Sequence, residues 1–117
     1  MRRGDIWTAA GGNDYAGKPR PVVIMQDDSF DATDSITICA FTSTPIEAPL
    51  FRLVVTPSAS NGLVEESRLM VDKITTVPKT RLGRRVGRLD DRDMVRLNQA
   101  MLVFLGLAGS SRRSAHG

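Results

Sequence analysis

The chain has 117 residues, of which 41% are hydrophobic and 25% charged, a composition typical of one globular domain with a single core. The net charge is +3, but Arg2, Arg3, Arg112 and Arg113 lie at the two ends, so the body is nearly neutral and its charge does not by itself argue for a nucleic-acid partner. The polar amino terminus and the lack of a long apolar run exclude a signal peptide and a spanning segment, which predicts a cytoplasmic protein with no membrane association.

Short apolar segments with strand-type alternation predict β-strands along most of the chain. The first covers residues 5–9, and a glycine-rich loop at 10–18 separates it from a second at 21–26. A third runs from residue 36 to residue 44, and a fourth covers residues 51–55. Residues 67–77 form one bent strand or two short ones, and residues 84–88 form a last strand whose cations favour a sheet edge. The long loop at 10–18 is expected to act as a flap.

The hydrophobic period becomes helical after residue 89. Asp90 is a good N-cap, and Asp91 and Asp93 complement the positive end of a helix dipole. Gly106 is a suitable stop. The apolar face of this helix is expected to contain Met94, Leu97, Met101, Leu102, Phe104 and Leu105, with Arg92, Arg96 and Gln99 on the other side. The sequence therefore predicts a mainly β (α+β) domain over residues 1–107, a small barrel of five to seven short strands with one amphipathic C-terminal helix, and a disordered tail at 108–117.

The residue content excludes several kinds of site. His116, the only histidine, lies in the tail, which argues against a histidine base or a catalytic triad. Cys39 has no second cysteine to pair with and sits in an alternating apolar run, so we expect a small core residue in a reducing compartment and no zinc site. The aspartates at 27, 28, 31 and 34 lack the glycine and glutamate of a calcium loop, and no phosphate-loop motif occurs. The chemistry is thus expected to need neither metal nor cofactor.

Arg20 stands between two prolines at the start of the second predicted strand. Pro21 lacks a backbone donor and pushes the preceding residue into extended geometry, so Arg20 enters the strand with little backbone freedom. A guanidinium keeps its proton to very high pH, and its planar fork fits phosphate oxygens. Two interpretations remain open: an anion-binding or catalytic group at the mouth of the sheet, or an exposed arginine that ends a loop.

Hydroxyl side chains at the end of the third predicted strand form a second candidate group, Thr42, Ser43 and Thr44. A threonine there can donate a hydrogen bond to an oxygen that gains charge when a phosphodiester is attacked, and such preorganised donors are worth about 3 kcal/mol each. This arrangement is consistent with RNA cleavage, in which the substrate supplies its own 2′-hydroxyl. The alternative is an ordinary β-compatible surface.

Several segments in one order resemble the MazF/PemK family, the toxin endoribonucleases of bacterial toxin–antitoxin pairs. They are the opening Arg3-Gly4-Asp5-Ile6-Trp7, the glycine-rich loop, Arg20-Pro21-Val22-Val23-Ile24, a strand ending in threonine, and the closing amphipathic helix. Residues 72–77 match the late strand of the family more loosely. The likeness covers residues 2 to about 107.

The resemblance implies an SH3-like barrel that forms a homodimer and cuts single-stranded RNA at a short sequence, leaving a 2′,3′-cyclic phosphate and a 5′-hydroxyl. A small, partly disordered MazE-like antitoxin would cover the RNA groove, and DNA would be bound only through it. The catalytic arginine of the family falls on Arg20 and its threonine on Thr42. Some relatives have an arginine two positions before the late-strand aspartate, where this chain has Met70. Either that contribution is missing or Arg68 supplies it.

The remaining expected site residues bind substrate. Asp14, Tyr15 and Lys18 belong to the flap, which would read the bases, and Ser43 and Asp72 complete the set. Many family members carry Gly-Ser-Glu-Gln where this chain has Gly-Asn-Asp-Tyr at 12–15, so Asp14 stands in place of a longer glutamate. Tyr15 either stacks on a base or anchors the loop to the barrel.

Two other functions remain open at this point. The same barrel occurs in toxins such as CcdB, which bind DNA gyrase and cleave nothing. That class uses the end of its C-terminal helix, with a tryptophan near the terminus, whereas the only tryptophan here is Trp7. A catalytically idle relative that serves as an interaction module is the other possibility.

Overall fold

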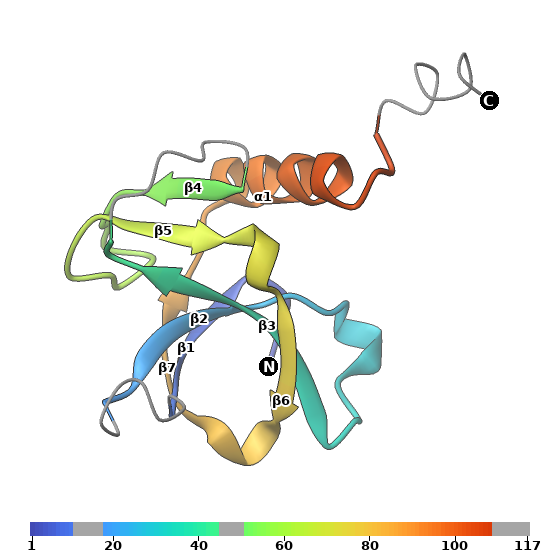
Figure 1. Cartoon of the computed structure of the whole chain (residues 1–117). Helices are drawn as coiled ribbons and strands as arrows, with labels where there is room; N and C mark the ends of the chain where they lie inside the picture. The colour runs from blue at the N-terminus through green and yellow to red at the C-terminus, as the bar shows by residue number, and fades with distance from the viewer. Residues whose placement is uncertain (11–17, 45–50, 109–117) are drawn as a thin grey trace.

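The computed structural model describes residues 1–10, 18–44 and 51–108. This part of the chain forms one seven-stranded sheet that curves into a small barrel, with a single α-helix lying along one side (Figure 1). The elements are β1 (Asp5–Ala9), β2 (Arg20–Ile24), β3 (Ser35–Thr42), β4 (Arg52–Val55), β5 (Ser67–Met70), β6 (Thr75–Pro78), β7 (Leu82–Arg88) and α1 (Asp91–Phe104). The predicted fold class, a mainly β barrel with a C-terminal helix, is confirmed. No described helix has the length and apolar character that a membrane crossing requires.

The strand order explains how the sheet closes. Neighbouring strands follow the order β4-β5-β3-β2-β1-β7, and β6 joins through β3. The first half of β3 pairs with β6, at Ile38 and Thr75, while its last residues pair with β5, at Phe41 and Leu69. The stretch predicted as one bent strand or two is therefore two strands, separated by the short 3-10 helix η3 (Val71–Lys73). β7 lies at an edge, as its cations predicted.

Alternating side chains of the central strands fill two apolar clusters. Ile6, Val23 and Phe41 belong to the cluster under α1, and Val22 and Ile24 to a second cluster on the opposite face of the strands. Each such side chain contributes about 1.5–3 kcal/mol when it is fully buried. β2 is apolar on both faces because both faces are covered, which explains its continuous apolar run.

The helix begins and ends close to the predicted residues but buries a narrower face. The Asp90 carboxylate accepts a hydrogen bond from the Asp93 backbone N–H at 2.8 Å, which is the expected N-cap. Leu97 is fully buried in the cluster under α1. Leu102 and Leu105, expected on the core face, are 45% and 56% exposed, and this part of the prediction was wrong. Phe104, also expected there, is 45% exposed. The last helical turns carry apolar residues on several sides of the helix, and the core covers only one side.

Candidate active site

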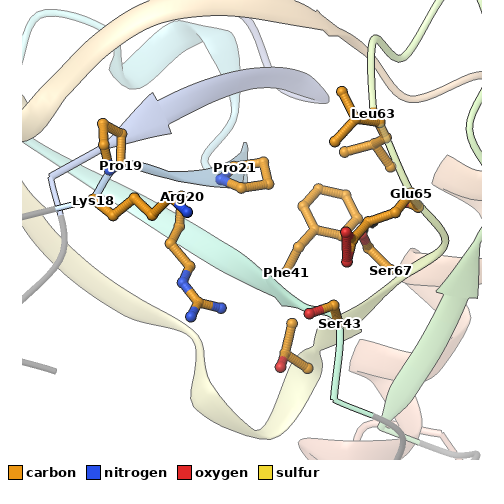
Figure 2. Close-up of a pocket in the computed structure, with 11 residues that line it drawn as sticks. Lys18, Pro19, Arg20, Pro21, Phe41, Ser43, Leu63, Glu65 and Ser67 are labelled. Carbon is orange, nitrogen blue, oxygen red and sulfur yellow. Dashed lines mark hydrogen bonds between the residues drawn. The ribbon is translucent and has the colours of Figure 1, made fainter. Parts of the chain in front are cut away.

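A pocket of about 310 Å³ opens where β2 begins and β3 ends (Figure 2). Three segments distant in sequence form its walls: the start of β2, the end of β3, and the loop that leads into β5. Its lining consists of Lys18, Pro19, Arg20, Pro21, Phe41, Thr42, Ser43, Leu63, Val64, Glu65 and Ser67. Four of the sequence-predicted site residues, Lys18, Arg20, Thr42 and Ser43, therefore line one cavity.

The pairing of β2 with β3 accounts for the position of the pocket. Their ladder runs from Ile24 to Val22, and Val22 is the partner of Ala40. Extending this antiparallel register by two residues would set Arg20 opposite Thr42. Pro21 has no N–H with which to continue a ladder. The β2–β3 pairing ends at Val22 and Ala40, and residues of both strands beyond that pair line the pocket.

The cationic wall of the pocket comes from Lys18 and Arg20. Arg20 is half-buried and pairs with Ala9 of β1, which fixes its backbone within the sheet. Its guanidinium points into the open side of the pocket, below Pro21 (Figure 2). Lys18 is exposed and lies beside it. This wall presents positive charge and planar hydrogen-bond donors to an anion that enters the pocket.

Thr42 ends β3 on the facing wall and is half-buried. Its Oγ1 accepts a hydrogen bond from the backbone N–H of Thr44 at 3.2 Å. A hydroxyl has two lone pairs and one proton, and this bond uses a lone pair. The hydroxyl proton therefore is not consumed by it, while the bond restrains the oxygen. Thr42 can donate to a ligand from a fixed position.

The pocket also contains a carboxylate that sequence reasoning missed. Figure 2 draws Glu65 with its side chain directed into the cavity, on the side of Ser43 and Ser67. The Ser67 hydroxyl donates to the Glu65 backbone carbonyl at 3.0 Å, which holds the loop against β5. Upstream, the buried Asn61 accepts from the N–H of Leu63 at 3.0 Å. Nothing in the local sequence marks Glu65, because only the fold brings its loop to the end of β3.

Asp72 lies outside the pocket. Its carboxylate forms an ion pair with Arg52 at 2.9 Å, and the two side chains are 24% and 8% exposed. The thiol of Cys39 is near this pair, and burial raises its pKa to about 12, with a smaller contribution in the same direction from the Asp72 charge. Cys39 is fully buried, which confirms its prediction as a core residue. Asp14 and Tyr15 lie outside the described residues.

The described groups define what the pocket can do. It combines a guanidinium, a hydroxyl donor and a carboxylate within a volume that admits part of a nucleotide. Such a set can bind a phosphate, stabilise charge that develops on its oxygens, and exchange a proton. Within residues 1–10, 18–44 and 51–108, no three or more His, Cys, Asp or Glu side chains form a group that could hold a metal ion.

Comparisons with known proteins all point to one family of toxins. The family described as PemK-like, MazF-like toxin of type II toxin–antitoxin system matches residues 2–105. The chain is 57% identical over 109 residues to the probable endoribonuclease MazF of Mycolicibacterium smegmatis, covering 93% of this chain and 100% of that protein. It is 30% identical over 112 residues to the endoribonuclease MazF of Staphylococcus saprophyticus, covering 92% of each.

Solved structures show the same fold. The Mycobacterium tuberculosis toxin MazF-mt6 superposes with a TM-score of 0.71 at 26% identity, covering 84% of this chain and 92% of that one. A MazE–MazF structure from Deinococcus radiodurans gives a TM-score of 0.72 at 16% identity, covering 91% and 96%. The barrel with its C-terminal helix is thus an arrangement that these toxins share.

Proposed function

Since the chain belongs to the family of PemK-like, MazF-like toxins of type II toxin–antitoxin systems, we propose that it is an endoribonuclease toxin that cuts single-stranded RNA at a short sequence. The observation that carries the proposal is the pocket in which Arg20 and Thr42, from two different strands, face one cavity beside Lys18 and Ser43. Relatives named endoribonuclease support the reaction class.

In the proposed mechanism the substrate supplies the nucleophile. The ribose 2′-oxygen loses its proton and bonds to phosphorus, the bond from phosphorus to the 5′-oxygen breaks, and the 5′-oxygen takes up a proton. The products are a 2′,3′-cyclic phosphate and a 5′-hydroxyl. Arg20 binds the scissile phosphate and assists proton transfer, and Thr42 donates to the oxygen on which charge develops. Donors fixed before the reaction need no reorganisation when the charge appears.

The acceptor of the 2′-proton is a separate question. An arginine keeps its own proton to very high pH and is a poor base. Among the described lining residues the carboxylate belongs to Glu65, and Asp14 is the sequence-predicted carboxylate of the flap. Comparing Glu65→Gln with Asp14→Asn assigns the role: the variant that loses the acidic limb of the pH–rate profile has lost the base. Glu66→Gln, the neighbouring exposed carboxylate, is the matched control.

The proposed partners are a MazE-like antitoxin and a second copy of the chain. Structures of relatives include an endoribonuclease with its cognate antitoxin from a mycobacterial species and MazE–MazF assemblies. The helix end leaves Leu102, Val103, Phe104 and Leu105 between 45% and 56% exposed, which is apolar surface that a protein partner would cover. We assign the toxin to the cytoplasm, where its RNA substrate is found.

One assay tests the proposal. Purified protein is incubated with single-stranded RNA in excess EDTA, and the ends of the fragments are mapped. The proposal expects cleavage at a short sequence with 2′,3′-cyclic phosphate and 5′-hydroxyl ends. Absence of cleavage together with tight binding to DNA gyrase would support the CcdB-like alternative instead. Absence of both activities would indicate an idle interaction module.

A further inference from the structure

Three arginines on elements next to the pocket, none of them among its lining residues, carry guanidinium groups without an ion pair or hydrogen bond in the described part of the chain. They are Arg68 of β5, Arg81 of the 3-10 helix η4 (Lys79–Arg81), and Arg84 of β7. Two other arginines of β7 do have a partner: Arg85 and Arg88 lie 3.4 and 3.5 Å from a carboxylate oxygen of Asp5. The three arginines are therefore not needed to balance a structural charge.

Strand pairing sets these arginines on opposite sides of the pocket. Arg68 is the β5 partner of Thr42, and directly opposed residues of an antiparallel pair have Cβ atoms about 4.5–5.5 Å apart. On the other side, Ala9 of β1 pairs with both Arg20 and Leu82. Leu82 is thus two strands from Arg20, about 10 Å at the usual spacing of strands. Arg81 precedes Leu82, and Arg84 follows it by two residues.

Figure 1 shows β2, β1 and β7 side by side below the end of β3 and the start of β5, in agreement with the pairing. A line drawn across the strands from β5 to β7 therefore meets Arg68, then the pocket, then the pair Arg81 and Arg84. Arg68 is half-buried, and Arg81 and Arg84 are exposed. The cations lie across the strands rather than along one of them, with the candidate active site between them.

We propose that the RNA backbone crosses the strands along this line, with Arg68 binding a phosphate on one side of the scissile phosphate and Arg84, aided by Arg81, binding a phosphate on the other. The inference rests on the proposed ribonuclease function and says how the substrate extends beyond the cut site. A guanidinium without a carboxylate partner binds phosphate without first breaking an ion pair, and its fork can do so with two hydrogen bonds. The arginines on both sides of the pocket would then be parts of one substrate site that holds a few nucleotides.

An acidic protein segment is the other kind of ligand that such cations attract. RNA is favoured because the cations flank the pocket on both sides and Arg68 stands beside Thr42 itself. A carboxylate can also pair with Arg20, but the proposed cleavage requires a phosphate at both Arg20 and Thr42, and an RNA strand places further phosphates on both sides of that position.

The test measures binding of an RNA that contains the mapped cut site with a 2′-O-methyl group at the reacting ribose, which blocks cleavage. Dissociation constants are determined at several salt concentrations for wild type, Arg68→Ala, Arg84→Ala and Arg92→Ala. Arg92 is exposed in α1 and serves as the matched control. Thermal unfolding of each variant confirms that it folds. Arg68→Lys tests whether charge alone suffices.

The proposal expects Arg68→Ala and Arg84→Ala each to weaken binding about tenfold and to reduce the salt slope by about 0.7, with Arg92→Ala unchanged. Arg68→Lys should recover the slope but only part of the affinity. RNAs shortened at one end should lose the effect of Arg68→Ala alone, and RNAs shortened at the other end the effect of Arg84→Ala alone.

Three results would overturn the inference: slopes equal to that of Arg92→Ala, both variants responding to the same RNA end, or unchanged RNA binding with weakened antitoxin binding. The last result would assign these arginines to the protein partner. A wild-type protein that neither binds nor cuts RNA would instead refute the proposed function itself, so the two failures are distinguishable.

Discussion

In the part of the chain that the structure describes, the pocket and the core beneath α1 each combine an arginine, a carboxylate and a side chain of β3, but they differ in burial. In the pocket these groups are Arg20, Glu65 and Thr42, of which Glu65 is exposed and the other two are half-buried. All three face a cavity that opens to solvent. A ligand that enters the cavity can therefore reach each of them.

The second place lies in the core beneath α1 and contains Arg52, Asp72 and Cys39. Arg52 is 8% exposed and is held by the Asp72 carboxylate at 2.9 Å, while Cys39 is fully buried. Here the same kinds of groups neutralise one another or are cut off from solvent. Residue type alone therefore does not identify a site, and access to solvent distinguishes these two places.

The largest expected effect concerns the pocket arginine. Arg20→Ala should reduce kcat at least about a thousandfold, because in the proposed mechanism this guanidinium binds the scissile phosphate. Its thermal unfolding should stay near that of wild type, since Arg20 lies at a strand end. The measurement is single-turnover cleavage of RNA alongside a melting curve. A variant that retains full activity would move the active site elsewhere.

The core arginine should show the opposite pattern. Arg52→Ala leaves the Asp72 charge in a largely buried position without its partner, which we expect to lower the free energy of unfolding by about 3 kcal/mol. Specific activity at a temperature where the variant is folded should change little. Urea unfolding together with the cleavage assay measures both quantities. Loss of activity without loss of stability would show that this ion pair belongs to the site after all.

Thr42→Val tests the hydroxyl of the pocket with almost no change in side-chain shape. We expect kcat to fall about a hundredfold while KM stays close to the wild-type value, because the donor acts mainly when charge develops. Thr37→Val is the control on the same strand, since its hydroxyl pairs with that of Thr76 at 2.7 Å, away from the pocket. If both variants lost activity equally, a general weakening of β3 would explain the result.

The smallest expected effect concerns Cys39. Its pKa is raised from 9.0 to about 12, so the folded protein keeps the thiol protonated where an unfolded chain would ionise. Below pH 9 the thiol contributes no pH dependence; between pH 9 and pH 12 stability should fall as pH rises, because only the unfolded state loses the proton. At pH 8 iodoacetamide should modify the thiol slowly in the native protein and rapidly in urea. Rapid native modification would contradict its burial.

Much of the fold was readable from the sequence because the relevant signals are local. The alternation in residues 5–9 and the run from Val22 to Ile24 specify strands within a few residues, and Asp90 specifies the helix start through its own side chain. The positions of Arg20 at the start of one strand and Thr42 at the end of another were also readable from local sequence, and both residues line the pocket.

Tertiary structure alone decided which of these groups meet. Glu65 enters the pocket, and Asp72 is held by Arg52 twenty residues away, because strand register and loop placement set those distances. The exposure of Leu102 and Leu105 likewise follows from how far the core extends beneath α1. A local sequence pattern specifies the conformation of its own segment. Which side chains become partners, which face is buried and where a pocket opens depend on the segments that the rest of the fold packs against it.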